Sequence, residues 1–462
     1  MSLPAGWRVR PLGEVCSKPQ YGWTSRAEKT GKVRYLRTTD ISGAEVNWNS
    51  VPFCAQEPDS VAKYAIKDDD ILVSRAGSVG VSYRVRAAPE QTVFASYLIR
   101  FRAYEDEAWP SYLSWFLKSD YYWKAISEQS AGIAIPNVNA SKLAEIEVPL
   151  APLLEQRRIA GKLDRIAARL DGTKARLDTI PTILKRFRRS VLAAACSGRL
   201  TEDWRKANSK IHPTGRAAEE LNLIAVNKQK WASRNAGNHN EAARLLKRTK
   251  SVPTNDHQSQ GLPDCWCWTT IRELCHLVVD CHNKTAPYAK HGIPLIRTTN
   301  VKDGRLLLDD TKFVDEKTYA YWSRRCPPEP GDIVFTREAP IGDAGIVPER
   351  KRVCLGQRTM LFRVWHPLTS NRYLLFAVLS PTFQAQYNDY AVGGGVIHLR
   401  VGDVEGLRLP LPPHAEQTEI VRRVESMMRH ADAIESSYRK AKVFTDKLMP
   451  SVLSKAFRGE LA

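Results

Sequence analysis

The sequence predicts a mixed α/β fold made of two copies of one unit, each an α/β head followed by a long helix. Three observations predict it. The two halves of the 462-residue chain repeat each other. The first part of each half carries short β-branched and aromatic runs separated by turn residues, and the second part carries an apolar period of 3.5 residues. A repeat this long indicates a duplicated domain rather than a solenoid.

The repeat is defined by four pairs of matching segments. These pairs are LPAGWRVRPLGE (3–14) with LPDCWCWTTIRE (262–273), DILVSRAGSVG (70–80) with DIVFTREAPIG (332–342), YLSWFLKSD (112–120) with YLLFAVLSP (373–381), and SVLAAACSGRL (190–200) with SVLSKAFRGEL (451–461). The members of each pair lie about 260 positions apart. We therefore treat the chain as two equivalent copies.

The head of each copy is predicted from its strand-like runs. DILVS, VGVSYRV and FASYLIRF are rich in β-branched and aromatic residues, and Gly, Asp and Asn separate them, which is typical of strands joined by turns. PSYLSWFLKS predicts a helix. The head ends at a Pro-rich stretch, VPLAP in the first copy and LPLPP in the second, where a helix is expected to begin.

The long helices are predicted from a narrow seam. Seam residues recur at alternating steps of four and three, the signature of helices that supercoil on one another. They are Ile159, Leu163, Ile166, Leu170, Thr173, Leu177, Ile180, Leu184, Phe187, Val191 and Ala194 in the first copy, and Ile420, Val424, Met427, Ala431, Ile434, Tyr438, Ala441, Thr445, Leu448 and Val452 in the second. We expect the helices to pair as an antiparallel coiled coil; the alternative is that each buries its seam against its own head.

Two prolines and an insert modify this plan. Pro181 and Pro450 do not align, and each is expected to kink its helix or break it into two segments. The insert between the copies has two short amphipathic helical candidates and reads as a mobile connector without chemistry. The predicted divisions are a first head (1–151), a central helical spacer (152–200), a charged insert or linker (201–261), a second head (262–411) and a C-terminal helical spacer (412–462).

The charge of the chain indicates its partner. Sixty-nine Lys and Arg against fifty Asp and Glu leave a formal net charge of +19, which is the footprint of a partner with regularly spaced negative charge. The alternative partner, an acidic membrane surface, usually requires a concentrated basic amphipathic helix. LKRFRRSVL (184–192) comes nearest, and it also reads as a solvated helix face. Nucleic acid is therefore the expected partner.

Cysteine usage and hydropathy indicate the compartment. Nine cysteines at irregular spacings fit free thiols in a reducing compartment. No run of eighteen uncharged apolar residues and no leader-like N-terminus is found, so we expect a cytoplasmic protein. A zinc site is the minor alternative for the cluster Cys265, Cys267, Cys275, His276, Cys281 and His282, whose spacings are not those of a zinc ribbon. The tryptophans among them favour a strand packed into a core.

The order of these motifs resembles a known family. LPAGW, then EQRRIAGKLD and KARLDTIPTILKRFRRSVLAAACSGRLTEDWR, then a second head followed by EQTEIVRRVESMMRHADAIE and SVLSKAFRGEL, is similar to the DNA specificity subunits of type I restriction-modification systems. The resemblance covers essentially the whole chain. It implies two target recognition domains on antiparallel helices that bind a two-part double-stranded DNA sequence. It also implies recruitment of two adenine methyltransferase (modification) subunits and of ATP-driven translocase-nuclease (restriction) subunits.

The search for catalytic motifs agrees with a non-catalytic chain. No Asn/Asp-Pro-Pro-Tyr/Phe segment and no phosphate-binding Gly-x-x-x-x-Gly-Lys-Ser/Thr loop occurs. Asp315-Glu316-Lys317 has the Asp-x-Lys pattern of a nuclease site, but it lacks an upstream acidic partner and reads as a chance match. We expect no cofactor in this chain, with S-adenosylmethionine, ATP and Mg²⁺ on the partner subunits.

Candidate DNA-binding residues fall into shared and divergent sets. Shared residues are expected to grip the DNA backbone or build the fold: Arg37, Thr38, Thr39 and Asp40 with Arg297, Thr298, Thr299 and Asn300, and also Arg75 with Arg337. Residues that differ between copies are expected to read bases: Gly77, Ser78 and Asn137 in the first copy, and His398 in the second. Gln357 and Arg358 lie in LGQRT (355–359), a stretch common in the recognition domains of this family. The alternative for the shared motif is that its threonines cap a strand and its arginine pairs with an acid of the fold.

The hypothesis is that each head docks in a major groove at one half-site and that the helices set the spacing. Each half-site would contain an adenine that a recruited methyltransferase flips out and methylates at N6. An unbroken helix of 36 residues, Ile159 to Ala194, is about 54 Å long and could act as a ruler. Two other classes stay open: a stand-alone two-headed DNA-binding regulator, and the specificity module of a single-chain methyltransferase-nuclease.

Overall fold

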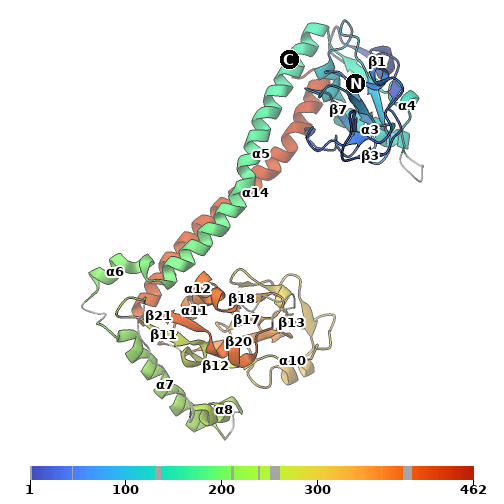
Figure 1. The fold of residues 1–462 in the computed structure, drawn as a ribbon. Coiled ribbons are helices and arrows are strands. Elements are labelled where there is room, and N and C mark those ends of the chain that lie inside the picture. Colours follow the sequence, from blue (N-terminus) through green and yellow to red (C-terminus); the bar gives the residue numbers. More distant parts are fainter. Residues whose placement is uncertain are drawn as a thin grey trace. The chain divides into compact units, whose positions relative to one another are not determined.

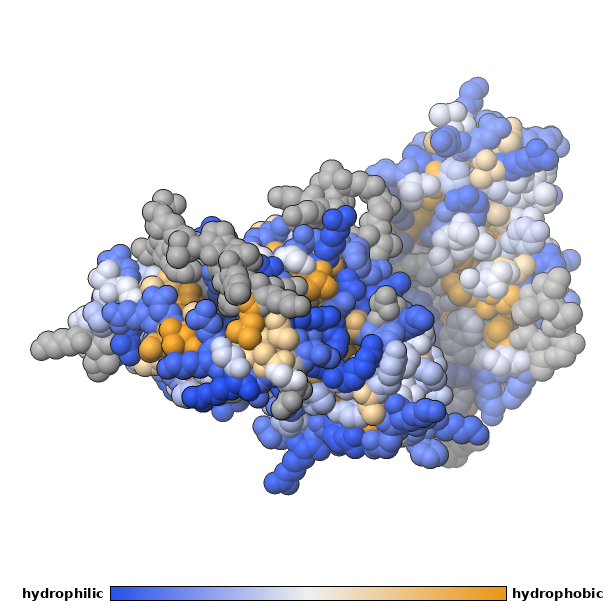
Figure 2. Space-filling model, turned by 90° about the horizontal axis from the view of Figure 1, so that it is seen from below, coloured by the Kyte–Doolittle hydropathy of each residue, from blue (hydrophilic) through white to orange (hydrophobic). Residues whose placement is uncertain are grey.

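A computed structural model describes residues 3–43, 45–130, 137–209, 213–237, 240–249, 261–282, 284–365, 367–388 and 398–461. The chain divides into two compact units, which are described separately. The first comprises 1–179 and 437–462, and the second comprises 180–436. The face drawn in Figure 2 is mostly hydrophilic, with apolar residues in small separate groups.

The first unit contains a mixed α/β head and parts of two long helices (Figure 1). Its elements are β1 (Arg8–Pro11), η1 (Leu12–Glu14), β2 (Gln20–Tyr21), β3 (Ala27–Glu28), β4 (Arg34–Leu36), β5 (Phe53–Cys54), α1 (Val61–Tyr64), β6 (Ile71–Ser74), β7 (Ser82–Arg84), β8 (Thr92–Phe94), β9 (Leu98–Phe101), α2 (Pro110–Phe116), α3 (Asp120–Ser130), α4 (Ala140–Ala144), β10 (Glu147–Leu150), the start of α5 (Leu153–Cys196) and the end of α14 (His414–Phe457).

The second unit contains the second head, the rest of both long helices and, among its described residues, four short helical elements between α5 and that head. Its further elements are η2 (Arg199–Thr201), α6 (Glu202–Ala207), α7 (Arg216–Asn235), α8 (Asn240–Thr249), β11 (Cys267–Thr270), α9 (Ile271–Leu274), β12 (Cys275–Asp280), β13 (Ile293–Ile296), η3 (Thr298–Asn300), β14 (Val301–Lys302), β15 (Arg305–Leu306), β16 (Lys312–Val314), α10 (Glu316–Trp322), β17 (Ile333–Arg337), β18 (Ile341–Ile346), β19 (Cys354–Leu355), β20 (Thr359–Val364), α11 (Asn371–Val378), α12 (Pro381–Asn388), α13 (Val401–Gly406) and β21 (Arg408–Leu411).

The two heads have the same sheet topology. The antiparallel sheet β2-β9-β6-β7 of the first head corresponds to β12-β20-β17-β18 of the second, and β5-β4-β8 corresponds to β16-β13-β19. In both heads the middle strand of the smaller sheet pairs antiparallel on one side and parallel on the other. The first strand also pairs with the last in each head, β1 with β10 and β11 with β21. The duplication predicted from sequence is therefore present in these shared strands, whereas β3 of the first head and the β14-β15 pair of the second have no counterpart among them.

A buried aspartate fixes the start of the same strand in each head. Arg102 donates to both oxygens of Asp70, at 2.6 and 3.1 Å, just before β6. Arg363 likewise donates to Asp332, at 2.8 and 2.7 Å, just before β17. Bidentate arginine–carboxylate pairs fix geometry as well as charge. The Asp-Ile pair that opens each matching segment is thus structural. We call the backbone and the buried ion pairs that the two heads share the frame.

A glutamine attaches the start of each long helix to its own head. The Gln156 Oε1 atom accepts from the backbone N–H of Trp109 at 2.8 Å, and Gln417 Oε1 accepts from that of Ser370 at 2.9 Å. Both glutamine side chains are buried. The shared Glu-Gln dipeptide after the Pro-rich stretch therefore explains where each helix begins.

The long helices run antiparallel within each unit. In the first unit Lys174 of α5 lies 3.6 Å from Asp446 of α14, and Asp178 lies 3.6 Å from Lys442. In the second unit Arg188 donates to two carboxylates of α14 at 2.8 Å. Later residues of α5 contact earlier residues of α14. The two helices therefore run in opposite directions, as predicted.

The seam is buried or partly buried at most of its positions. Leu170 and Thr445 are buried in the first unit, and Leu184 and Ala431 in the second. The predicted seam residues Thr173, Phe187 and Ile434 depart from this, since all three are exposed. At the ends of the helices the seam residues pack into the cores of the heads. The alternative, in which each helix buries its seam against a head, therefore holds at the ends.

The core of each head includes turns from both long helices. In the first unit, Ile159 and Leu163 of α5 and Phe457 of α14 pack into the core beneath the larger sheet. The ring centroid of Phe457 lies 5.2 Å from that of Tyr112 on α2. In the second unit, Ala195 and Cys196 of α5, together with Ile420 and Val424 of α14, do the same.

The prolines do not break the helices. Pro181 lies inside α5 and Pro450 inside α14, and each helix continues past its proline as one element. Both prolines are exposed, so the ring meets solvent rather than a packed neighbour, and each removes one backbone donor. Of the two predicted outcomes, the break into two segments is wrong, and the kink stays a prediction.

The insert is not a mobile connector over its described residues, because it packs on the second head. Ala217, Leu221 and Ile224 of α7 are buried in the core of that head, and Figure 1 shows α7 running along its side. Buried Lys228 donates to the carbonyl oxygens of Arg272 and Glu273 at 2.6 and 3.2 Å. The segment 250–260 lies outside the described residues.

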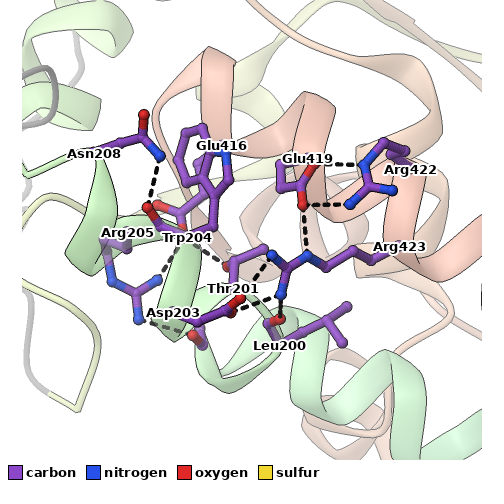
Figure 3. A network of polar contacts seen from close by, with 11 residues as sticks. Leu200, Thr201, Asp203, Trp204, Arg205, Asn208, Glu416, Glu419, Arg422 and Arg423 are labelled. Carbon is purple, nitrogen blue, oxygen red and sulfur yellow. Dashed lines mark hydrogen bonds and ion pairs between the residues drawn. The ribbon is translucent and has the colours of Figure 1, made fainter.

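Segment 200–205 after α5 is attached to the start of α14 by a network of charges (Figure 3). Arg423 donates to the Leu200 carbonyl oxygen at 2.9 Å and to both oxygens of Asp203 at 2.6 and 2.9 Å. Hydrogen bonds from Arg422 and Arg423 lower the pKa of Glu419 to about 2. The network keeps the insert in register with α14.

A buried acid lies at the centre of the same region. Glu416 is fully buried, and it accepts hydrogen bonds from Thr201 at 2.7 Å, from Arg205 at 2.5 Å and from the Trp266 indole at 2.8 Å. In the first unit, the indole nitrogen of the matching Trp7 is buried and has no hydrogen-bond partner among the described residues. The two units thus differ where the frame is otherwise repeated.

The predicted domain limits stay a prediction, because the compact units divide both long helices near their middles.

Among the described residues, no helix has the length and apolar character needed to cross a membrane.

Candidate nucleic-acid interface

The Arg-Thr-Thr motif follows β4 in the first head and β13 in the second, and its fourth residue closes a turn in both. Asp40 Oδ2 accepts from the backbone N–H of Arg37 at 2.8 Å. Asn300 Oδ1 accepts from the backbone N–H of Arg297 at 3.2 Å. A side-chain oxygen that bonds a nearby backbone N–H is the usual way in which Asp and Asn stabilise turns. The shared part of the motif is therefore explained by the fold.

The side chains of the motif differ between heads. Arg37 Nε and Nη2 donate to the two oxygens of Asp40 at 3.1 and 2.9 Å, and these hydrogen bonds raise the pKa of Arg37. Asn300 is buried, and its Nδ2 donates to the Asp310 carbonyl oxygen at 3.0 Å. In the first head the arginine is thus paired with an acid of the fold, as the alternative interpretation predicted.

The threonines separate into an inner and an outer residue. Thr298 Oγ1 donates to the Ala339 carbonyl oxygen at 3.0 Å, which ties the motif to the loop after β17. The matching Thr38 is partly buried, whereas Thr39 and Thr299 are exposed. Of the four threonines, these last two are available to a partner such as a phosphate oxygen.

Two arginines occupy equivalent positions at the end of β6 and β17. Each arginine donates its backbone N–H to the residue before β9 or β20, and its carbonyl accepts from the segment that precedes α4 or α13. The hydrogen bonds are Arg75 N to Tyr97 O at 2.9 Å and Val138 N to Arg75 O at 3.1 Å in the first head, and Arg337 N to Arg358 O at 3.0 Å and Leu399 N to Arg337 O at 3.1 Å in the second. Three distant segments therefore meet at one point in each head.

The arginine of the first head has neutral neighbours. Its guanidinium carbon lies 4.8 Å from the centroid of the Tyr21 ring, and its Nε donates to Asn137 Oδ1 at 3.4 Å. The Tyr21 hydroxyl accepts from the backbone N–H of Ala140 at 2.9 Å, which fixes the ring. The positive charge of Arg75 is not neutralised by these contacts.

The arginine of the second head lies in a charged cluster. Arg337 Nε is 3.3 Å from an oxygen of Asp280, and its Nη1 is 3.0 Å from His398 Nε2. His398 Nδ1 lies 2.8 Å from Glu338 Oε2. A guanidinium can only donate, so His398 Nε2 accepts and Nδ1 carries the proton that Glu338 accepts. Arg358 completes the cluster, with its Nε 3.2 Å from Glu338 Oε1.

The hairpin tips beside these arginines are exposed in both heads. Gly77 and Ser78 form the tip after β6, and Ala339 and Pro340 form the tip after β17. Gly77 has a φ of +75°, and no atom lies within 4 Å of where its Cβ would be. The first tip is thus open, and a larger side chain there is excluded by backbone conformation rather than by space.

The structure gathers some of the candidate residues and separates others. Arg75 contacts Asn137 in the first head, and Arg337 contacts His398 in the second, so these predicted pairs occupy matching places. Gln357 turns away from the cluster, since its Oε1 accepts from Thr285 at 3.1 Å.

Four residues of the two sites were missed by sequence reasoning: Tyr21, Tyr97, Asp280 and Glu338. Tyr97 is 61% exposed, which is high for an aromatic residue. The aligned copies place it opposite Arg358, and that alignment is the signal that could have found it. The two acids gave no signal, because they come from different segments.

The two alternative motifs have structural roles. No metal-binding group of His, Cys, Asp and Glu is found in the described part of the chain. Cys265, Cys267 and Cys275 are buried in the core of the second head, and burial raises the pKa of the Cys275 thiol to about 12. Asp315 caps α10 by accepting from the Thr318 backbone N–H at 2.7 Å, which accounts for the nuclease-like pattern.

Comparisons with known proteins agree with the geometry. The family model described as type I restriction modification DNA specificity domain matches twice, over residues 4–182 and 263–443. The type I restriction enzyme EcoKI specificity subunit of Escherichia coli strain K12 is 27% identical over 476 residues, which cover 99% of this chain and 90% of that protein.

Solved structures show the same fold. A chain solved in a study of complex assembly and conformational transition of the type I R-M system matches with a TM-score of 0.61 and 18% identity, over 100% of both chains. The HsdS subunit from Thermoanaerobacter tengcongensis matches with a TM-score of 0.54 and 18% identity, over 100% of this chain and 99% of that one.

This chain belongs to the type I restriction-modification DNA specificity family, because the family model covers most of both copies. It is the subunit that specifies the DNA target, and it is not a catalytic subunit.

Proposed function

We propose that this specificity subunit reads a two-part double-stranded DNA target, one half with each head, and that α5 and α14 set the distance between the halves. The observation that carries the proposal is the pair of equivalent arginines. Arg75 and Arg337 have matching backbone hydrogen bonds but different neighbours. A common frame with divergent side chains suits two heads that read different sequences.

The charge of the chain supports a large electrostatic contribution to binding. The net charge of +19 favours release of counterions from DNA phosphates. Exposed Thr39 and Thr299 have hydroxyls that suit phosphate contacts in both heads. Binding should therefore weaken steeply with salt, while the sequence preference depends on the divergent residues.

We propose that the chemistry is carried by partner subunits. Two adenine methyltransferase subunits would each flip an adenine from one half-site and methylate it at N6. Translocase-nuclease subunits would join for restriction. S-adenosylmethionine, ATP and Mg²⁺ would then be bound by those partners and not by this chain, which we propose to be the recognition subunit alone.

We propose the cytoplasm as the compartment, since all nine cysteines are free and buried. The head and spacer limits at 1–151, 152–200, 201–261, 262–411 and 412–462 are likewise proposed. A relative that the chain matches over 90% of its length is named a specificity subunit, so we propose a specificity subunit and keep the module of a single-chain enzyme as the alternative.

Exchange of a head tests the division of labour. Residues 1–151 are replaced by the same region of a relative that directs methylation to a different sequence. A genome-wide map of N6-methyladenine in cells that carry the partner subunits is then expected to show a change in one half of the motif only. A change in both halves would contradict the proposal.

Matched insertions test the ruler. Four residues are added to α5 at Lys174 and four to α14 at Asp446, because these residues face each other at 3.6 Å. The paired helices lengthen by about 6 Å, or about two base pairs of DNA. The spacer of the methylated motif is expected to lengthen by about that much with both half-sequences retained. An insertion in α5 alone is the control, and it should impair pairing instead.

A further inference from the structure

We infer that Arg358 reads a guanine in the half-site of the second head, and that Glu338 positions it. The inference rests on the proposed function, and it deepens that function by naming one base contact. Tyr97 occupies the matching place in the first head, so that head should lack this guanine contact.

The equivalence of the two positions comes from the backbone. Arg75 N donates to Tyr97 O, and Arg337 N donates to Arg358 O, at 2.9 and 3.0 Å. Tyr97 immediately precedes β9, and Arg358 immediately precedes β20, the matching strand. Both side chains are exposed, Tyr97 by 61% and Arg358 by 51%. The two heads thus present different groups from one place.

Arg358 is better suited to read a base than Arg337. Arg337 Nη1 contacts His398 and donates to the Leu399 carbonyl oxygen. Its Nε is buried 3.3 Å from Asp280 without a hydrogen bond, and its side chain is only 11% exposed, so it is not accessible to a base. Arg358 uses Nε toward Glu338, and no described residue pairs with its two Nη groups. Two free terminal donors match the O6 and N7 acceptors that guanine presents in the major groove.

Glu338 is held so that it can orient Arg358. One of its carboxylate oxygens faces Arg358 Nε, and the other accepts from His398 Nδ1 at 2.8 Å. The Glu338 side chain is only 17% exposed, so the pair is partly shielded from solvent. A charge-assisted contact to Nε fixes the plane of the guanidinium and leaves its outer edge free.

The backbone at Arg358 supports a functional role. Its φ is +69°, in the left-handed region that non-glycine residues rarely adopt. Two residues earlier, Gly356 N donates to the Ile296 carbonyl oxygen at 2.8 Å, and the backbone N–H of Arg337 donates to the Arg358 carbonyl oxygen at 3.0 Å, so the backbone is held on both sides of Gln357. Strained backbone of this kind concentrates at binding sites.

The test is a coupling measurement between one side chain and one base atom. The wild-type motif is first obtained from N6-methyladenine mapping. The chain, assembled with its methyltransferase partners, is then titrated with duplexes in which 7-deazaguanine, which lacks the N7 acceptor, replaces each motif guanine in turn. Wild-type protein is expected to lose about tenfold in affinity at one guanine of one half-site.

Substitution of Arg358 should remove that loss. In R358G the same 7-deaza duplex should bind as well as the unmodified one, while effects at the other half-site stay as in wild type. R358G also suits the left-handed backbone, so its thermal midpoint of unfolding should be unchanged or raised, which separates loss of contact from misfolding. E338Q should give a smaller coupling, because Arg358 keeps its donors but loses its anchor.

R352K is the matched control. Arg352 is an exposed arginine of the same head. It pairs bidentately with Glu316, which is not part of the cluster around Arg337 and Arg358. It should leave every base dependence unchanged. The inference is overturned if R358G retains the full 7-deaza effect at every guanine, or if the second half-site contains no guanine. If the wild-type complex shows no sequence preference at all, the proposed function fails as well.

Discussion

The two heads share a frame, but they differ in the groups placed on it. Asp70 with Arg102 and Asp332 with Arg363 fix the same strand in both. At the end of that strand the first head has an arginine among neutral groups, whereas the second has one enclosed by acids and a histidine. The backbone hydrogen bonds around Arg75 and Arg337 are the same in both heads, whereas the side chains beside these arginines differ. The shared backbone therefore defines the site, and its side chains are free to diverge.

The units also differ at the ends of their helices. Glu416 in the second unit accepts from an indole, a hydroxyl and a guanidinium, whereas the indole of Trp7 in the first has no partner among the described residues. Variants at shared positions should therefore affect both units, and variants at unshared positions only the second.

Removal of the frame aspartate should destabilise both units. Asp70→Ala and Asp332→Ala each leave an arginine without its buried partner, which costs about 3–5 kcal/mol of unfolding free energy. The larger loss is expected in the first unit, because buried Arg100 also lies 3.5 Å from Asp70. Hydrogen exchange of β6 and β17 measures each unit separately. Each variant should destabilise the unit that contains it. If only one of the two variants lowers stability, the ion pair does not have the same role in both heads.

Removal of the helix-end acid should act on one unit only. Glu416→Ala leaves Arg205 and the Trp266 indole without their acceptor, and we expect a loss of about 3 kcal/mol in the second unit. The matching Glu155→Ala should cost about 0.5 kcal/mol or less. Hydrogen exchange of 197–207 and of the first turns of α5 reports the two effects. Equal losses would contradict the asymmetry.

The buried Lys228 should make the second unit more stable at high pH. Burial lowers its pKa from 10.5 to about 8. Below pH 8 Lys228 is charged in the folded unit, and burial of that charge lowers the free energy of unfolding. Between about pH 8 and 10.5 the folded unit has released a proton that the unfolded chain keeps, so the free energy of unfolding rises by about 3 kcal/mol across this range. Urea unfolding of wild type and Lys228→Met across this range gives the difference, which should vanish in the variant.

The helix ion pairs should contribute least. Lys174→Ala and Lys442→Ala remove pairs at 3.6 Å between exposed side chains, and each should lower the free energy of unfolding by less than Arg188→Ala does. Arg188→Ala in the second unit should cost about 1 kcal/mol, because it contacts Asp432 and Glu435 at 2.8 Å. Double-mutant cycles measure the coupling, and a larger value for Lys174 would reverse this order.

Much of the fold could be predicted because the repeat and the helix period are properties of sequence spacing. The seam identified both long helices, and the aligned copies placed Arg75 with Arg337 and Asn137 with His398. The insert was misread, since Lys228 resembles a solvated charge until Arg272 and Glu273 supply its acceptors. No pattern in one segment reveals a partner in another.

The candidate site was predicted less well for the same reason. The Arg-Thr-Thr motif was found, but its local turn explains most of its conservation between copies. Asp280 and Glu338 come from different segments, and each acquires meaning only beside Arg337 or Arg358. The contacts that divide the two heads are therefore tertiary, and only the residues that carry them are visible in the sequence.

The composition of the first unit sets an order of events during synthesis. Phe457 and Leu453 fill the core of the first head, so a ribosome must translate nearly all of the chain before that core can close. The second unit is one continuous stretch, 180–436, and it can close earlier. The head that is made first therefore matures last, and until then its apolar sheet face needs protection from other nascent chains.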